Sequence, residues 1–210
     1  MSKVGFNLYL ITGRNQTGGR PLEAVVEGAL AGGVRAVQLR EKDLDIRSLL
    51  LLAEKLRNLT RKYGALLFIN ERADVCLAVD ADGVHLRSDG LPPLEARKVL
   101  GPEKMIGVSC HTLQEAVNAE EGKADFITLG PVYGTPSKAG MGESIGLSRF
   151  QSAAGGIAIP AFALGGIGSG QAGDVMRHGA KGIAVISALM SAPDPEKEAR
   201  FLLSILSMRA

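Results

Sequence analysis

The 210-residue sequence has few cysteines, no long apolar run and almost no net charge. Its two cysteines, Cys76 and Cys110, lie in apolar surroundings without the spacing of metal ligands, which indicates a reducing, cytoplasmic setting. No apolar run approaches the roughly 20 residues of a membrane span. A net charge of +2 gives no argument for nucleic acid, whose recognition calls for clustered basic residues. We therefore expect a protein that binds neither membranes nor nucleic acid.

Linkers, low-complexity tracts and shifts in composition are also missing from the chain. What is present is a content of 46% apolar and 22% charged residues, which excludes a disordered chain. A chain of this mass buries about 70% of its unfolded surface on folding, which is ample for one core. We expect one domain over residues 1–210.

Short β-rich apolar runs alternate with segments of helical period. The clearest helical segments are Ile46–Tyr63, Leu113–Glu121 with Thr112 as N-cap, and Asp194–Leu206 with Asp194 as cap. Eight such strand and helix units predict a compact, closed (β/α)8 TIM barrel, with an open doubly wound sheet as the alternative. The expected strands are Phe6–Thr12, Ala36–Arg40, Ala65–Asn70, Gly83–Leu86, Met105–Ser109, Phe126–Gly130, Ile159–Leu164 and Gly182–Ser187.

A weak internal repeat recurs in the second, fourth, sixth and eighth expected strands. In each, alternate positions are aliphatic, as in Val37 and Leu39, while the other positions are polar or small, as in Gln38 and His85. Successive side chains on a strand face opposite sides. The aliphatic set should therefore pack under the helices, and the polar set should point into the barrel near its mouth.

In such barrels the working site lies at the carboxyl ends of the strands. Arg40, Lys42 and Lys138 bring three cations to this end, which suits a polyanion such as a diphosphate. Gly165-Gly166 and Ser187 follow the seventh and eighth strands, where this fold recurrently binds a monophosphate. Two separate phosphate subsites suggest that two phosphorylated substrates are joined. Other polar residues at these strand ends are Gln38, Asn70, Glu71, His85, Asp89, Ser109, His111, Thr135 and Ser137.

Plainer readings of the same residues stay open. A Gly-Gly pair after a strand can be only a tight turn, and Arg40 and Lys42 can form a solvated edge. Burying the amide of Gln38 without a partner would cost about 1–3 kcal/mol, so its place in an apolar strand favours a functional role. We interpret His85 and His111 as hydrogen-bonded mouth residues rather than metal ligands or bases, and Cys110 as a core residue.

With these residues in place, the chain resembles the thiamine phosphate synthase family over nearly its whole length. Eight short segments in order carry the resemblance. They are Val37–Lys42, Ile69–Asp74, Ala81–Leu86, Gly107–Thr112, Leu129–Tyr133, Thr135–Lys138, Gly165–Ile167 and Val185–Ser187.

The resemblance implies a barrel enzyme that joins 4-amino-5-hydroxymethyl-2-methylpyrimidine diphosphate to 4-methyl-5-(2-phosphoethyl)thiazole, with Mg²⁺ helping. The pyrimidine and its diphosphate would be held by Gln38, Arg40, Lys42, Asn70, Ser109 and Lys138. The thiazole phosphate would be held by Thr135, Ser137, Gly166, Ile186 and Ser187. Among these residues we expect Arg40, Lys42, Lys138 and Ser109 to carry catalysis, and we assign His85, His111 and Gly165 to substrate binding. The expected partners are these two small substrates, and a homo-oligomer stays open.

Departures from the family pattern keep three hypotheses open. The first metal-binding carboxylate is Glu71 instead of Asp, and the second aligns with Gly90, which leaves Asp89 one position early. We therefore expect Glu71 and Asp89 to hold Mg²⁺, with weakened affinity. The related thiazole tautomerases use a catalytic histidine that aligns with Pro131 here. The transferase is our preferred hypothesis. A thiazole tautomerase and a non-catalytic phosphate-binding relative are the alternatives.

Overall fold

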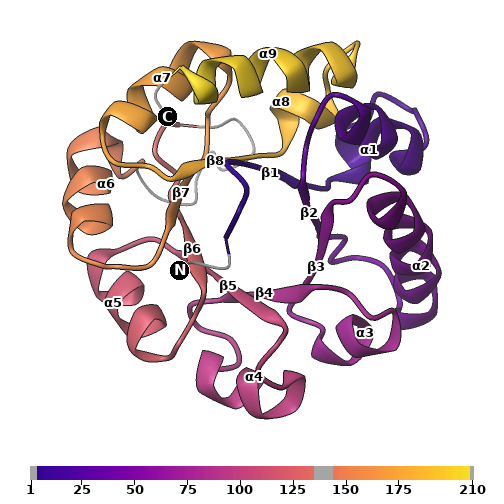
Figure 1. Cartoon of the computed structure of the whole chain (residues 1–210), viewed down its shortest axis with the longest axis horizontal. Helices are drawn as coiled ribbons and strands as arrows, with labels where there is room; N and C mark the ends of the chain where they lie inside the picture. Colours follow the sequence, from indigo (N-terminus) through magenta and orange to yellow (C-terminus); the bar gives the residue numbers. More distant parts are fainter. Residues whose placement is uncertain (1–3, 135–143, 209–210) are drawn as a thin grey trace.

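The computed structural model describes residues 4–134 and 144–208 of the chain. Thr135, Ser137 and Lys138, which are predicted to bind substrate, lie outside the described residues. The described part forms a closed barrel of parallel strands in chain order, with helices around it (Figure 1), so the prediction of a (β/α)8 barrel is confirmed. The strands are β1 Leu8–Ile11, β2 Ala36–Leu39, β3 Leu66–Asn70, β4 Gly83–Arg87, β5 Met105–Cys110, β6 Phe126–Leu129, β7 Ala161–Leu164 and β8 Gly182–Val185.

Local sequence signals set the helix bounds. The predicted capping residues Thr112 and Asp194 accept hydrogen bonds from the backbone N–H groups of Glu115 and Lys197. These bonds satisfy donors that the first turn of a helix leaves free. The helices are η1 Arg14–Gln16, α1 Leu22–Ala31, α2 Ile46–Lys62, α3 Ala73–Ala78, α4 Pro93–Leu100, α5 Leu113–Glu121, α6 Gly146–Gly155, α7 Ser169–Arg177, α8 Ser187–Met190 and α9 Pro195–Ser207.

The alternation of side chains along the strands divides the core into two parts. The aliphatic positions of the even strands, among them Val37, Leu39 and Val84, pack with the helices in one large outer cluster, as predicted. The other positions face the barrel interior, where Ala36 and Ala184 belong to a second cluster. The inward set therefore decides what lines the barrel.

Aromatic rings fill the amino-terminal half of the barrel interior. Phe6, Tyr9, Phe68, Phe126 and Phe162 contact one another with ring centroids 5.0 to 6.3 Å apart, mostly edge to face. All five side chains are buried. Such pairs stabilise by about 0.5–1.5 kcal/mol each beyond the burial of their area. We call these five rings the aromatic plug.

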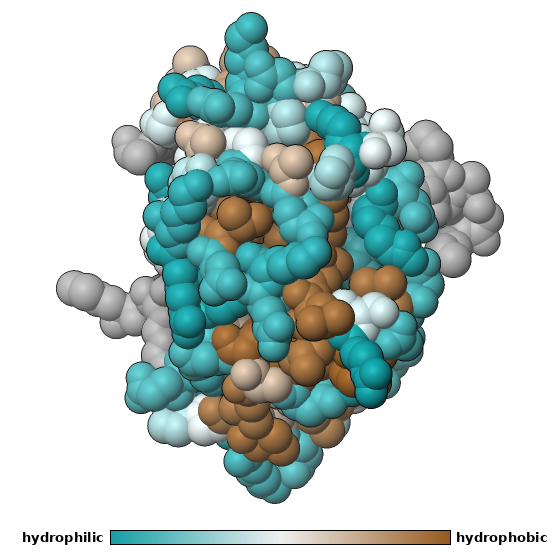
Figure 2. Space-filling model, turned by 90° about the vertical axis from the view of Figure 1, so that its right-hand side faces the viewer, coloured by the Kyte–Doolittle hydropathy of each residue, from teal (hydrophilic) through white to brown (hydrophobic). Residues whose placement is uncertain are grey.

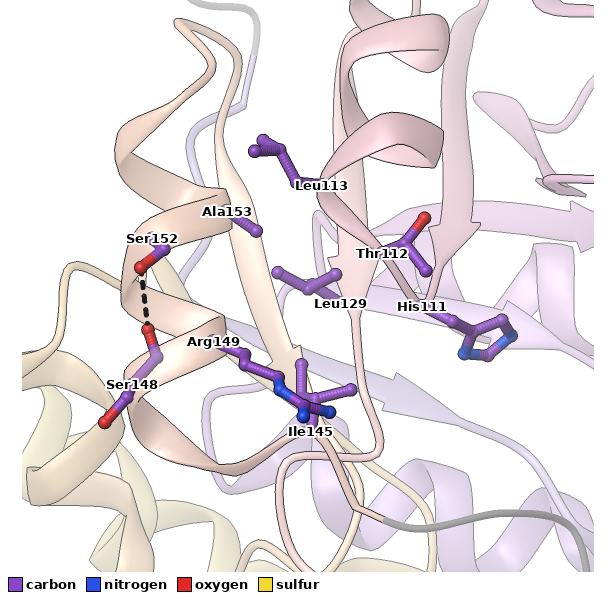
Figure 3. A pocket seen from close by; sticks show the side chains of 9 residues that line it. All are labelled: His111, Thr112, Leu113, Leu129, Ile145, Ser148, Arg149, Ser152 and Ala153. Atoms are coloured by element: carbon purple, nitrogen blue, oxygen red, sulfur yellow. Dashed lines mark hydrogen bonds between the residues drawn. The ribbon is translucent and has the colours of Figure 1, made fainter.

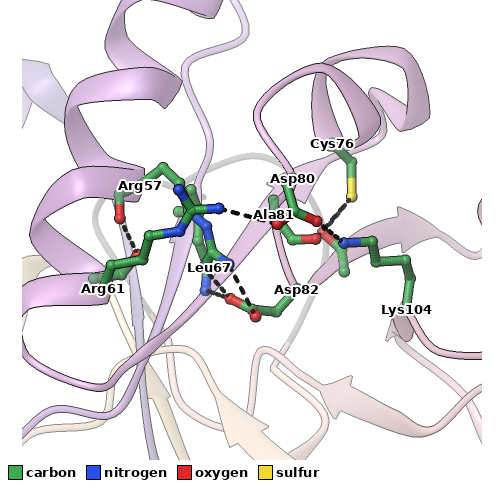
Figure 4. Close-up of polar contacts among 10 residues, drawn as sticks. Arg57, Arg61, Leu67, Cys76, Asp80, Ala81, Asp82 and Lys104 are labelled. Atoms are coloured by element: carbon green, nitrogen blue, oxygen red, sulfur yellow. Dashed lines mark hydrogen bonds and ion pairs between the residues drawn. The ribbon is translucent and has the colours of Figure 1, made fainter.

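Two carboxylates hold neighbouring strands together at the same end of the barrel. Asp82, just before β4, accepts the backbone N–H of Leu67 at 2.7 Å and pairs with Arg57 of α2 at 2.6 Å (Figure 4). Asp125, just before β6, accepts the N–H of Ile106 at 2.8 Å and pairs with Arg97 at 2.8 Å. Each carboxylate thus joins one strand to its neighbour and to a helix.

Charged side chains cover much of the outer surface. On the face that the right-hand side of Figure 1 presents, apolar side chains lie interspersed among hydrophilic ones (Figure 2). Ion pairs from Lys55 to Glu23 and from Lys62 to Glu27 link α2 to α1 there, while Leu51 of α2 is 55% exposed. Within residues 4–134 and 144–208, no helix is long and apolar enough to cross a membrane.

Candidate active site

A hydrogen-bonded network of polar side chains, four of them buried and one half-buried, adjoins the aromatic plug, which the His85 ring contacts. The Gln38 amide donates to the Tyr9 hydroxyl at 3.2 Å, and this hydroxyl lies 3.3 Å from Nδ1 of His85. Nε2 of His85 lies 3.0 Å from Oγ of Ser109 and 3.3 Å from Oγ1 of Thr128. The five side chains come from five different strands, so closure of the barrel is what brings them together.

The protonation states give this network a direction. Burial lowers the pKa of His85 to about 3, assisted by the charge of Arg40, so the imidazole is neutral at neutral pH. Burial also raises the pKa of Tyr9, which keeps its proton. Since the Tyr9 oxygen accepts from Gln38, its proton is free to bond Nδ1 of His85. Nε2 then carries the ring proton and donates it to Ser109.

Tyr9 and Thr128 were not among the predicted site residues. Both stand at inward-facing positions, because their registers on β1 and β6 match those of Ala184 on β8 and Ser109 on β5. The parity argument that selected Gln38 and His85 was applied only to the even strands, and the same argument applied to β1 would have selected Tyr9.

Cationic side chains gather beside this network at the ends of β2 and β4. The backbone N–H of Arg40 donates to the buried hydroxyl of Thr12 at 2.9 Å, which fixes the end of β2. The pKa of Lys42 is lowered by partial burial and by the charges of Arg40 and Arg87, against the opposing effect of Glu71. The structure thus brings the predicted Arg40 and Lys42 together and adds Arg87, which the prediction missed.

A pocket of about 290 Å³ opens at this edge of the barrel, between the ends of β2, β3 and β4. Its lining includes Lys42, Asn70, Glu71, Arg72 and Arg87. The Glu71 backbone has φ +59°, a conformation uncommon outside glycine, and its N–H donates to the carbonyl of residue 85 at 3.0 Å. The Asn70 amide donates to the Glu71 carboxylate at 3.3 Å. The turn after β3 therefore places an amide and a carboxylate in a cationic pocket.

The second carboxylate of the predicted metal site has a different partner. Asp89 forms an ion pair with Arg87 at 2.5 Å, and its side chain is 67% exposed. A Cβ atom placed on Gly90 would lie 3.5 Å from Oε1 of Glu71. Position 90 is therefore adjacent to the Glu71 carboxylate. In the described part of the chain, no three histidine, cysteine, aspartate or glutamate side chains group as metal ligands.

The predicted monophosphate residues lie at the ends of β7 and β8, which are neighbours in the barrel. Gly165 and Gly166 have φ values of +100° and +64°. A Cβ on Gly165 would lie 2.5 Å from Cβ of Pro131, and one on Gly166 would lie 2.8 Å from Cβ of Tyr133. The close packing against the loop after β6 is therefore enough to explain why both positions are glycine, without any role in phosphate binding. Ile186 is half-buried beside them, and Ser187 is exposed at the start of α8.

His111 lies apart from the buried network, in a pocket of about 370 Å³ between α5 and α6 (Figure 3). Its side chain is exposed, and its Nδ1 lies 2.5 Å from the carbonyl oxygen of Gly130. Leu129 also lines this pocket and belongs to the outer core cluster, and none of the five network side chains is among its lining residues. The predicted core residue Cys110 is buried, and burial raises the pKa of its thiol to about 12.

The fold and the position of its polar side chains define a class of protein. A closed parallel barrel with polar groups at the carboxyl ends of its strands is a (β/α)8 barrel of the kind that carries enzyme active sites at this end. A profile described as thiamine monophosphate synthase matches residues 8–189. The chain belongs to this family, as its resemblance predicted.

Relatives of known name agree with this assignment. A protein of Geobacter sulfurreducens is 54% identical over 209 residues, which cover 100% of this chain and 98% of the relative. The thiamine-phosphate synthase of Moorella thermoacetica is 43% identical over 202 residues, 96% of each chain. The solved thiamine phosphate pyrophosphorylase of Pyrococcus furiosus superposes with a TM-score of 0.88 at 39% identity and covers 96% of each chain.

Proposed function

We propose that this protein is a thiamine-phosphate synthase, a transferase that joins a pyrimidine diphosphate to a thiazole phosphate. The observation that carries the proposal is a pocket lined by Lys42 and Arg87 next to the network of Gln38 and His85. Arg40 lies between the two, since its charge acts on both Lys42 and His85. Such a pair of neighbouring sites suits one substrate with a hydrogen-bonding ring and a diphosphate. The similarity to named thiamine-phosphate synthases supports the same reaction.

In the proposed reaction the bond between the pyrimidine methylene carbon and the diphosphate oxygen breaks, and diphosphate leaves with the electron pair. The electron-rich aminopyrimidine carries the resulting cation until the thiazole nitrogen attacks the methylene carbon and forms the new C–N bond. The products are thiamine phosphate and diphosphate. No proton is transferred at the reacting atoms, so the site needs no general base.

The residues of this chain would act by binding and orienting. Arg40 and Lys42 would neutralise charge on the departing diphosphate, and Lys138 is proposed to join them. Because the Gln38 amide nitrogen donates to Tyr9, its oxygen is left to accept from the ring's amino group. The Ser109 hydroxyl oxygen accepts a hydrogen bond from Nε2–H of His85, so its own O–H is left to donate to the substrate. The thiazole phosphate would bind at Gly166, Ile186 and Ser187, with Thr135 and Ser137.

The residues present fit a magnesium ion that is shared with substrate. Mg²⁺ in such sites is held by one or two carboxylates together with substrate phosphates and water. The half-exposed carboxylate of Glu71, which receives one long hydrogen bond from Asn70 in a pocket open to substrate, is a suitable ligand. Asp89 would contribute after leaving Arg87. When bound, the ion would supply further positive charge to the departing diphosphate.

The test is product analysis with each set of substrates. With the pyrimidine diphosphate and the thiazole phosphate, we expect one diphosphate released per thiamine phosphate, with lower activity in EDTA. A tautomerase would instead isomerise the thiazole carboxylate phosphate without releasing diphosphate. That outcome would overturn the proposal and make His111 the first residue to mutate, since Pro131 offers no base.

A further inference from the structure

Arg87 stands at the mouth of the barrel in line with the buried network. It follows His85 by two positions on β4, and side chains two apart on a strand face the same way. Its backbone pairs in register with Ser109 of β5. Its side chain lines the pocket of about 290 Å³ together with Lys42 and Glu71. Arg87 is therefore placed to meet the same anion as Lys42.

The ion pair that Arg87 makes leaves it available for an anion. Arg87 contacts Asp89 through one nitrogen, and the two side chains are 50% and 67% exposed. Exposed pairs of this kind contribute little and exchange readily with a better anion. Arg72, which lines the same pocket, is held by Asp74 through two nitrogens, at 2.8 and 2.5 Å. Of these two arginines, Arg87 is the one free to form a fork onto phosphate oxygens.

Lys42, Arg72 and Arg87 line the pocket with two carboxylates, those of Glu41 and Glu71. The Glu41 carboxylate accepts the backbone N–H of Arg14 at 3.1 Å, which leaves Glu71 available to a ligand. Partial burial and the charges of Arg40 and Arg87 lower the pKa of Lys42, while the charge of Glu71 raises it, so these side chains lie near Lys42. Position 90, which lies next to Glu71, is glycine. Glu71 is thus the carboxylate of this pocket that is placed for a metal, an acidic residue at position 90 would add a second beside it, and Arg87 lines the same pocket.

We propose that Arg87 is a diphosphate-binding residue. Its guanidinium would supply positive charge that, with an acidic residue at position 90, a more tightly held metal ion would supply instead. The inference rests on the proposed function for the identity of the anion as a diphosphate. It implies that diphosphate binds this protein with measurable affinity even when divalent metal is removed. It also implies that a carboxylate at position 90 shifts binding towards dependence on metal.

The test is calorimetric titration of the intact protein with inorganic pyrophosphate in EDTA and again in Mg²⁺. We expect Arg87→Ala to weaken pyrophosphate binding in EDTA at least tenfold, and Arg87→Lys to give an intermediate loss because lysine lacks the fork. Arg61→Ala is the matched control. Arg61 is also an exposed arginine with one aspartate partner, but it lies at the amino-terminal end of the barrel. Its variant should bind as the wild type does.

Gly90→Asp provides the reciprocal variant. A Cβ at this position would meet its neighbours at 3.4 to 3.6 Å, which is ordinary contact, so the variant should fold. We expect weaker binding of pyrophosphate in EDTA and a larger gain on adding Mg²⁺ than the wild type shows. Unfolding midpoints equal to that of the wild type would confirm that the Arg87→Ala and Gly90→Asp variants are folded.

Two results would overturn the inference. One is equal pyrophosphate affinity of Arg87→Ala and the wild type in EDTA, and the other is no wild-type binding without metal. Formation of thiamine phosphate by the wild type is measured separately. If the wild type makes thiamine phosphate while Arg87→Ala binds normally, only the role of Arg87 fails. If the binding loss occurs but no thiamine phosphate forms, the proposed function fails and the anion site stands.

Discussion

The two ends of the barrel treat their charged side chains in opposite ways. At the amino-terminal end, Asp82 and Asp125 each have a backbone N–H and an arginine as fixed partners. At the carboxyl-terminal end, Lys42 and Arg87 line one open pocket, and the charge of Arg40 acts on Lys42. Groups with fixed, partly buried partners stabilise the fold, while cations gathered at an open pocket create a binding site for an anion. The difference indicates which charges serve stability and which serve chemistry.

The largest effect that we expect is the pH dependence of the unfolding free energy, and it comes from His85 in the buried network. Burial holds the pKa of His85 at about 3, below its usual 6.5. Between these values the unfolded chain binds a proton that the folded chain does not, so stability falls as the pH falls from 6.5 towards 3. The loss should be about 1.4 kcal/mol for each pH unit within this window. Above pH 6.5 this contribution is fully present.

Urea unfolding of the wild type and of His85→Gln across pH 4.5 to 7 measures this effect, because the variant removes only this titration. The wild type should show the steeper loss of unfolding free energy on acidification. Parallel curves for the two proteins would mean that His85 is solvated in the folded state, which would contradict its burial beside the aromatic plug.

Removing a carboxylate at the amino-terminal end should affect stability and leave the chemistry alone. Asp82→Ala strands the N–H of Leu67 and the side chain of Arg57, which is only 12% exposed. We expect a loss of about 2–3 kcal/mol in unfolding free energy, with kcat/KM for thiamine phosphate formation within twofold of wild type. Asp80→Asn is the matched control, since the 66% exposed side chain of Asp80 forms ion pairs nearby with Lys104 and Arg61, and asparagine tolerates its φ of +50°. Denaturant unfolding and steady-state kinetics on the same samples decide the outcome.

Tyr9 should combine both kinds of effect, because its ring belongs to the aromatic plug and its hydroxyl to the network. Tyr9→Phe keeps the ring contacts but leaves the Gln38 amide and Nδ1 of His85 without their partner. We expect a loss of about 1–2 kcal/mol in stability together with a several-fold lower kcat/KM. Nitrogen NMR of the His85 ring should report a changed tautomer balance. An unchanged ring spectrum would show that Tyr9 does not set the direction of the network.

Much of the fold followed from local patterns in the sequence. The alternation of Val37, Gln38 and Leu39 within one strand fixes which side chains face the helices, because this alternation is a property of the strand itself. Capping by Thr112 and Asp194 is equally local and was predicted correctly. The barrel followed because repeated strand and helix units of this length close in few ways.

The parts of the site that escaped prediction depend on contacts between distant strands. Tyr9 and His85 are 76 positions apart and meet only because the barrel closes. Arg87 was overlooked because the expected fourth strand ended at Leu86, while the observed one continues through Arg87 and keeps its side chain in line with His85. The predicted roles of Asp89, His111 and the thiazole-binding residues stay predictions.

The most direct test of this division between the two ends uses Arg40→Ala, measured for kcat/KM and for unfolding free energy on the same preparation. Charge-assisted hydrogen bonds contribute about 1.5–3 kcal/mol each, so loss of Arg40 should lower kcat/KM for thiamine phosphate formation at least tenfold. The unfolding free energy should stay within about 0.5 kcal/mol of wild type, since Arg40 is only half-buried and its backbone bond to Thr12 is retained. Wild-type kinetics in this variant, or a stability loss as large as that of Asp82→Ala, would contradict the assignment of the carboxyl-terminal cations to substrate binding.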